Sequence, residues 1–126
     1  MATDFLNSLA DITSTYVILG NHDGNLKATH RQDAVTPIVE ALNHPNLHLL
    51  KESGETLIKN NIVFNTVSIF DEENWIDPTD PSAINIALFH GSISGCKTDI
   101  GWVMKHGDHP ITIFDKFDFA MLGDIH

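Results

Sequence analysis

Three short apolar runs in this chain end in the same way, and this shared ending constrains the fold more than any other sequence feature. The runs cover residues 16–19, 84–89 and 119–122, and each leads directly into glycine and polar residues. Short apolar runs bounded in this way are typical of buried β-strands. In open α/β sheets, the polar residues that follow the strands gather in one crevice at the carboxyl ends. We therefore expect the three endings to converge on one point.

The spacing of the other apolar residues predicts a single α/β unit without internal repeats. Helical periodicity covers residues 4–12 and 35–42, and Asp33 is placed to cap the second helix. Further strands are expected at 47–50, at 111–114, and in a hairpin that joins 56–58 to 62–69. A short helix is expected at 102–104, and a polar, acidic loop at 70–82.

The composition narrows the classes of function. The 126 residues, of which 42% are hydrophobic, suffice for one domain with a core, and they argue against a disordered chain. Lys and Arg number 7 and Asp and Glu number 17, so the formal net charge is −10. This balance excludes a basic groove that follows a nucleic-acid backbone. Phosphate chemistry here would need its positive charge from a bound metal ion.

The sequence also indicates a compartment. No apolar run approaches the ~18–20 residues that span a bilayer, and the first residues lack the pattern of a signal peptide. Cys96 is the single cysteine, so an internal disulfide is impossible. These features favour a reducing, intracellular compartment. We expect a cytoplasmic protein without a membrane partner.

Together, the three endings carry side chains that suit a metal ion. In chain order they are Gly20-Asn21-His22-Asp23, His90-Gly91 and Gly123-Asp124-Ile125-His126. Imidazole nitrogen with carboxylate and amide oxygen suits Mn²⁺, Fe or Zn²⁺. The first ending is the most specific, because nothing structural requires Asn, His and Asp together after a strand. For the second the alternative is a hydrogen-bonded turn, and for the third a turn with an Asx hydrogen bond.

Other reactive side chains have simpler interpretations. His30 and Arg31 follow the first ending and are candidates for contact with a phosphate. Trp75 and Trp102 are expected to anchor the core or a loop rather than to stack on bases. The acidic run 71–73 is expected to be a solvated face. The remaining histidines are expected to be solvated or to cap turns: His44, His48, His106 and His109.

The order of the endings resembles the later motifs of the calcineurin-like metallophosphoesterases, whose full pattern runs D-x-H, G-D-x-x-D, G-N-H-D/E, H and G-H-x-H. The segments VILGNHDGNLKATHRQDAV and INIALFHGSISG are most similar to recombination nucleases of the SbcD type from bacteria and phages. The resemblance covers essentially the whole chain, but only the second part of the family's catalytic domain. It implies a metallophosphoesterase-type layered α/β sandwich with mixed sheets, partial over residues 1–126 and incomplete at both ends.

Carried over residue by residue, the resemblance implies a role for each matching side chain. Asn21, His90 and Asp124 would bind the second of two divalent metal ions, and His126 would bind the first. His22 would be catalytic, lying beside the scissile phosphate and stabilising charge or protonating the leaving oxygen. Asp124 stands where the family has histidine. The metal is therefore open among Mn²⁺, Fe and Zn²⁺, with Mn²⁺ favoured.

The match also has gaps. Asp23 would only support the loop or orient His22. The D-x-H and G-D-x-x-D motifs, which supply most ligands of the first metal in the family, have no match in residues 1–15, and His126 is the last residue. We therefore expect an internal part of a longer gene product.

The function implied is metal-dependent hydrolysis of a phosphodiester. Similarity around the motifs favours the nuclease subunit, a DNA exo- or endonuclease, of a recombination or repair complex. An SMC-like ATPase would be its partner, in the cytoplasm of a bacterium or a phage-infected host cell. Two alternatives stay open. One is another metallophosphoesterase, acting on phosphoproteins, cyclic nucleotides or small phosphoesters. The other is an inactive fragment that binds metal weakly.

Overall fold

The structure, a computed structural model, describes residues 2–20, 33–91, 93–94 and 109–123. Helices and strands alternate along most of this part of the chain. In order they are α1 (Ala2–Ile12), β1 (Thr15–Ile18), α2 (Thr36–Leu42), β2 (Leu47–Leu50), β3 (Gly54–Lys59), β4 (Ile62–Val67), the 3-10 helix η1 (Glu72–Asn74), β5 (Ile84–His90), β6 (Ile93–Ser94), β7 (His109–Pro110), the 3-10 helix η2 (Ile111–Phe114) and β8 (Phe119–Gly123).

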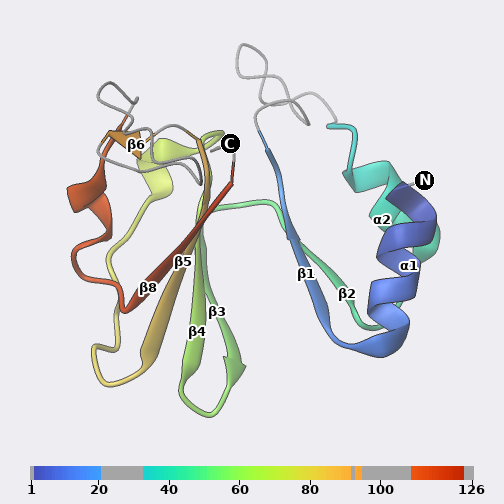
Figure 1. Ribbon diagram of the computed structural model, residues 1–126, viewed down its shortest axis with the longest axis horizontal. Helices are drawn as coiled ribbons and strands as arrows, with labels where there is room; N and C mark the ends of the chain where they lie inside the picture. Colours follow the sequence, from blue (N-terminus) through green and yellow to red (C-terminus); the bar gives the residue numbers. More distant parts are fainter. Residues whose placement is uncertain (1, 21–32, 92, 95–108, 124–126) are drawn as a thin grey trace, which may run out of the picture.

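The strands form a mixed four-stranded sheet and two small parallel pairs. The four-stranded sheet has the order β3-β4-β5-β8, in which β3 and β4 are antiparallel and the other neighbours are parallel. β1 pairs with β2, and β6 pairs with β7. Figure 1 shows α1 and α2 on the outer side of β1 and β2, with the four-stranded sheet on their other side. The fold is therefore α/β with mixed strand directions.

The main core lies on one face of the four-stranded sheet. Because side chains alternate along a strand, Val67 of β4 and Ala87 and Phe89 of β5 point to the same side. There they form a buried cluster with Ile93 and Phe114. The opposite face of the sheet looks toward β1, where the rings of Phe64 and Tyr16 meet edge to face at 5.4 Å.

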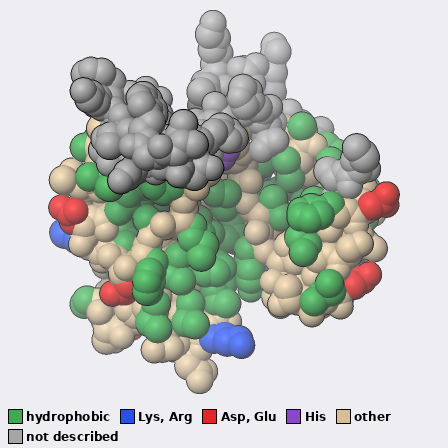
Figure 2. Space-filling view, viewed as in Figure 1, with side chains coloured by type: hydrophobic (Ala, Val, Ile, Leu, Met, Phe, Trp, Pro, Cys, Tyr) green, Lys and Arg blue, Asp and Glu red, His purple; other side chains and the backbone are tan. Residues whose placement is uncertain are grey.

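β8 is an edge strand with exposed apolar side chains. Phe119 and Met121 are 62% and 59% exposed. In Figure 2 apolar side chains gather over the half of the molecule that holds the four-stranded sheet. Among the described residues, no helix is long and apolar enough to cross a membrane.

Most of the predicted elements are confirmed where the structure describes them, including both helices, the hairpin and the three strands that carry the endings. The strand predicted at 111–114 is wrong, because these residues form η2. A 3-10 turn buries Phe114 in the core while leaving Ile111 half exposed, whereas a strand would place them on opposite faces of a sheet. The helix predicted at 102–104 lies outside the described residues.

Candidate functional site

The three strands that carry the endings finish at the same end of the molecule. β5 and β8 are parallel neighbours, and His90, the last residue of β5, lies opposite Gly123, the last residue of β8. Figure 1 shows that β1 also runs toward this end. Leu19 and Gly20, which follow β1, are buried. The three strands therefore end on the same side of the molecule, and the convergence of the residues that follow β1 and β8 stays a prediction.

His90 is the candidate ligand that the structure describes. Its side chain is half buried, and the Nδ1 edge of its imidazole faces β8 at Gly123. A Cβ added at Gly123 would lie 2.5 Å from Nδ1 of His90 and 3.3 Å from its Cγ. The ring thus occupies the space that a side chain at position 123 would fill.

The other candidate side chains lie outside the described residues, so the structure neither brings them to His90 nor separates them from it. They are Asn21, His22, Asp23, His30, Arg31, Asp124 and His126. Within the described part of the chain, no three His, Cys, Asp or Glu side chains are grouped as a metal site. This part of the chain includes His90 but not Asn21, Asp124 or His126, the other predicted ligands.

Asp33 fixes the chain immediately after residues 21–32. Its Oδ1 accepts hydrogen bonds from the backbone N–H groups of Val35 (2.8 Å) and Thr36 (2.6 Å), and its Oδ2 accepts one from the Thr36 hydroxyl (2.6 Å). Lys51 lies 3.1 Å from the same carboxylate. Asp33 thus binds the start of α2, although the N-cap residue itself is Val35 and not Asp33. The carboxylate joins the first turn of α2 to the end of β2.

The charged form of Asp33 is favoured despite its burial. Burial by itself raises the pKa of this carboxyl. The hydrogen bonds from Thr36, Lys51 and Val35 outweigh burial and hold the pKa well below its usual range. An anion fixed here by N–H donors at a helix start is also favoured by the helix dipole.

A network of serine hydroxyls holds the loop at the carboxyl end of β4. Asp71 accepts hydrogen bonds from the Ser53 backbone N–H (2.8 Å) and hydroxyl (2.6 Å), and the Ser53 hydroxyl accepts one from the Ser68 N–H (2.8 Å). The Trp75 indole donates to the Ser68 carbonyl at 2.6 Å. Trp75 thus anchors a loop and the core, as predicted. The acidic run 71–73 was predicted to be a solvated face. Asp71 is instead hydrogen-bonded to Ser53, which corrects that prediction.

His109 is the residue that sequence reasoning missed. It was expected to be solvated or capping, yet its Nε2 lies 2.6 Å from Oε1 of Glu72. The centroid of its ring lies 4.8 Å from the ring centroid of Trp75. It lies 6.0 Å from that of Phe89, which it meets edge to face. These partners are far from His109 in sequence, so no local pattern signals the contact. The interactions join β7 to η1 and the core.

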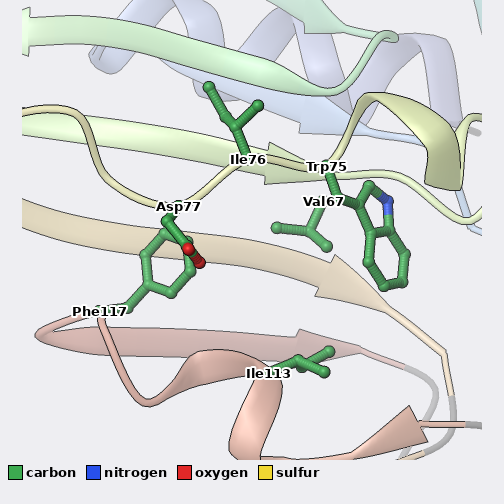
Figure 3. Close-up of a pocket in the computed structure, with 6 residues that line it drawn as sticks. All are labelled: Val67, Trp75, Ile76, Asp77, Ile113 and Phe117. Carbon is green, nitrogen blue, oxygen red and sulfur yellow. The ribbon is translucent and has the colours of Figure 1, made fainter.

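A separate cavity of about 250 Å³ lies on the core side of the four-stranded sheet. Figure 3 shows the side chains around it. Apart from Asp77 they are apolar or aromatic: Val67, Trp75, Ile76, Ile113 and Phe117. Asp77 pairs with Lys116 at 3.2 Å, and both side chains are exposed. Among the described residues, His90 is the candidate metal ligand, and it is not part of the lining of this cavity.

No family model matches the chain. Across its full length the chain is similar to an uncharacterized protein of Acanthamoeba polyphaga mimivirus, with 35% identity over 137 aligned positions. The alignment covers 100% of this chain and 10% of the viral protein. The chain thus spans about a tenth of the relative that it matches.

Proposed function

We propose that this chain is part of the catalytic domain of a calcineurin-like metallophosphoesterase that hydrolyses phosphodiesters in DNA. The observation that carries the proposal is the common end of β1, β5 and β8, with His90 seated over Gly123. The residues that match the family's motifs in sequence follow or finish these strands. The α/β class with a mixed sheet is compatible with the layered sandwich of that family.

The donor set fits a divalent transition metal. His90 places a half-buried imidazole at the end of β5, and Asp124 and His126 directly follow β8 in sequence. Asn21 follows Gly20 after β1. Amide oxygen, carboxylate oxygen and imidazole nitrogen suit Mn²⁺, with Fe and Zn²⁺ as the alternatives. Two such ions, when bound, supply water activation and charge neutralisation at the phosphate.

The chain's own residues would position the substrate and move a proton. His22 would lie beside the scissile phosphate and protonate the leaving oxygen, as general-acid catalysis requires. Asp23 would orient His22, and His30 and Arg31 would contact non-bridging phosphate oxygens.

DNA is the proposed substrate, and the charge of the chain shapes how it is held. A net charge of −10 disfavours extended contact with a phosphate backbone. Binding of long DNA would therefore depend on the metal ions and on a partner, for which we propose an SMC-like ATPase. The same charge favours the second candidate, hydrolysis of a small phosphoester that needs no extended contact.

Hydrolysis by the natural protein in which this sequence occurs separates the two candidates. With Mn²⁺ present, we expect cleavage of linear duplex DNA, and we expect His22→Ala to abolish it while the bound Mn²⁺ is retained. His44→Ala is the matched control, because His44 precedes β2 at the end of the β1-β2 pair opposite the strand endings. Cleavage of a small chromogenic phosphoester alone would reject the nuclease. Turnover of neither substrate would reject the hydrolase.

A further inference from the structure

The imidazole of His90 lies so close to Gly123 that any residue with a Cβ at position 123 would clash with it. A Cβ built there would lie 2.5 Å from Nδ1, 3.3 Å from Cγ and 3.4 Å from Cε1 of the same imidazole. Ordinary contacts of a Cβ lie between 3.4 and 4 Å. The Nδ1 edge of the ring therefore lies against β8 at Gly123, the register position directly opposite His90.

We propose that Gly123 is a positioning residue for His90: by lacking a side chain it lets the imidazole bring its Nδ1 edge against the end of β8. This proposal rests on the proposed function, in which His90 binds a metal ion. A methyl group at position 123 would push the ring off β8, since the nearest ring atom is not the end of a long, flexible side chain. Histidine has only two side-chain torsions with which to escape, and both would re-aim its nitrogen atoms.

The proposed role of Gly123 does not depend on the conformational freedom of glycine. Among the described residues, Gly54 is the glycine with a positive φ, at 146°. Gly123 lies within a regular parallel pairing of β8 with β5. Space for the ring, and not a strained backbone, is what this position requires. The sequence alone suggests only that a glycine at a strand end allows a sharp turn.

Gly91 offers a matched control for crowding. A Cβ at Gly91 would lie 2.7 Å from Cζ of Phe89 and 3.3 Å from Cγ2 of Ile69. Alanine at either position therefore overpacks the molecule, but the group that it crowds is different. Removal of the His90 imidazole relieves the crowding at position 123 and leaves that at position 91 in place.

The test is a double-mutant cycle of thermal unfolding on the full chain, combined with Mn²⁺ binding followed by electron paramagnetic resonance. We expect Gly123→Ala to lower Tm by about 5 °C, since overpacking of this kind destabilises a domain of this size by that order. In the His90→Ala background the same change should cost far less. Gly91→Ala should lower Tm equally in both backgrounds. Loss of a supporting contact typically weakens metal binding about 10- to 100-fold, and we expect such a fall for Gly123→Ala.

The outcomes separate this inference from the proposed function. An equal Tm loss from Gly123→Ala with and without the imidazole would overturn the positioning role. So would unchanged Mn²⁺ affinity in Gly123→Ala when His90→Ala loses it. If His90→Ala itself leaves Mn²⁺ affinity unchanged, the metal role of His90 fails, while the Tm cycle still decides whether Gly123 seats the ring. Weaker Mn²⁺ binding in Gly123→Ala, with no further loss in the double variant relative to His90→Ala, supports the inference.

Discussion

The carboxylate of Asp33 should be a main stabilising group of the half of the molecule that holds α1, α2, β1 and β2. The residue is 6% exposed, it accepts hydrogen bonds from two backbone N–H groups and one hydroxyl, and it lies 3.1 Å from Lys51. A hydrogen bond to a charged group contributes about 1.5–3 kcal/mol. Replacement by alanine removes all of these acceptors and should cost about 4 kcal/mol. Such a loss is a large part of a typical domain stability of about 5–15 kcal/mol.

Asp33→Asn isolates the charge. The amide keeps one oxygen acceptor for the Val35 and Thr36 N–H groups but loses the anion, so we expect a cost of about 2 kcal/mol near neutral pH. The pKa of Asp33 is lowered in the folded protein, so the unfolded chain takes up the proton first as the pH falls. The stabilisation is therefore complete above the unfolded pKa of about 3.9 and declines as the pH falls below it.

The assay is urea unfolding followed by far-ultraviolet circular dichroism, at neutral pH and at about pH 3. Glu40→Gln is the control, because Glu40 is exposed on α2 and an exposed substitution changes stability by no more than about 0.5 kcal/mol. The difference between the wild type and Asp33→Asn should be smaller in acid. A cost below about 0.5 kcal/mol at neutral pH, or a cost that stays constant into acid, would refute the reasoning.

Three further substitutions test the packing and can be measured by the same unfolding assay. Phe89→Ala should cost about 3–5 kcal/mol, because the ring is fully buried and lies at the centre of the core cluster; a cost below about 1.5 kcal/mol would show that the core is elsewhere. Asn85→Ala should cost about 2 kcal/mol, since the buried amide donates to two carbonyls of the 80–83 loop; no loss would mean that this loop is held by other contacts. Asp11→Ala should change stability by less than about 1 kcal/mol, because Asp11 is 63% exposed and its contact with His44 is open to solvent; a larger loss would show that this contact stabilises the fold more than its exposure predicts.

Local sequence patterns were sufficient to predict a helix or strand where the residues of that element alone determine it. The alternation and turn residues of the β3-β4 hairpin, and the apolar runs of β5 and β8, are read directly from the chain. The pattern at 111–114 misled, since two isoleucines and a phenylalanine favour a strand by propensity. Tertiary packing decided otherwise, because Phe114 completes the core from a 3-10 turn. The division into a four-stranded sheet and two separate pairs depends on pairing between strands that are distant in sequence. Short stretches of sequence do not indicate such pairing.

Of the candidate site, the shared end of β1, β5 and β8 could be predicted from the sequence. It follows from the period of the strands and from the rule for carboxyl ends. The seat of His90 on Gly123 was not predictable, because it depends on the register between β5 and β8. Likewise, the pairing of His109 with Glu72 joins segments whose proximity is set by the packing of β7 against η1. Such contacts are properties of the folded chain.

Electron spin-echo spectroscopy of Mn²⁺ bound to the protein tests the central claim most directly, because it detects nitrogen nuclei that coordinate the ion. The account predicts an imidazole nitrogen signal that falls in His90→Ala and is unchanged in His44→Ala, whose histidine lies at the opposite end of the β1-β2 pair. A spectrum without imidazole nitrogen, or one that His90→Ala leaves unaltered, would contradict a metal centre at the ends of these strands.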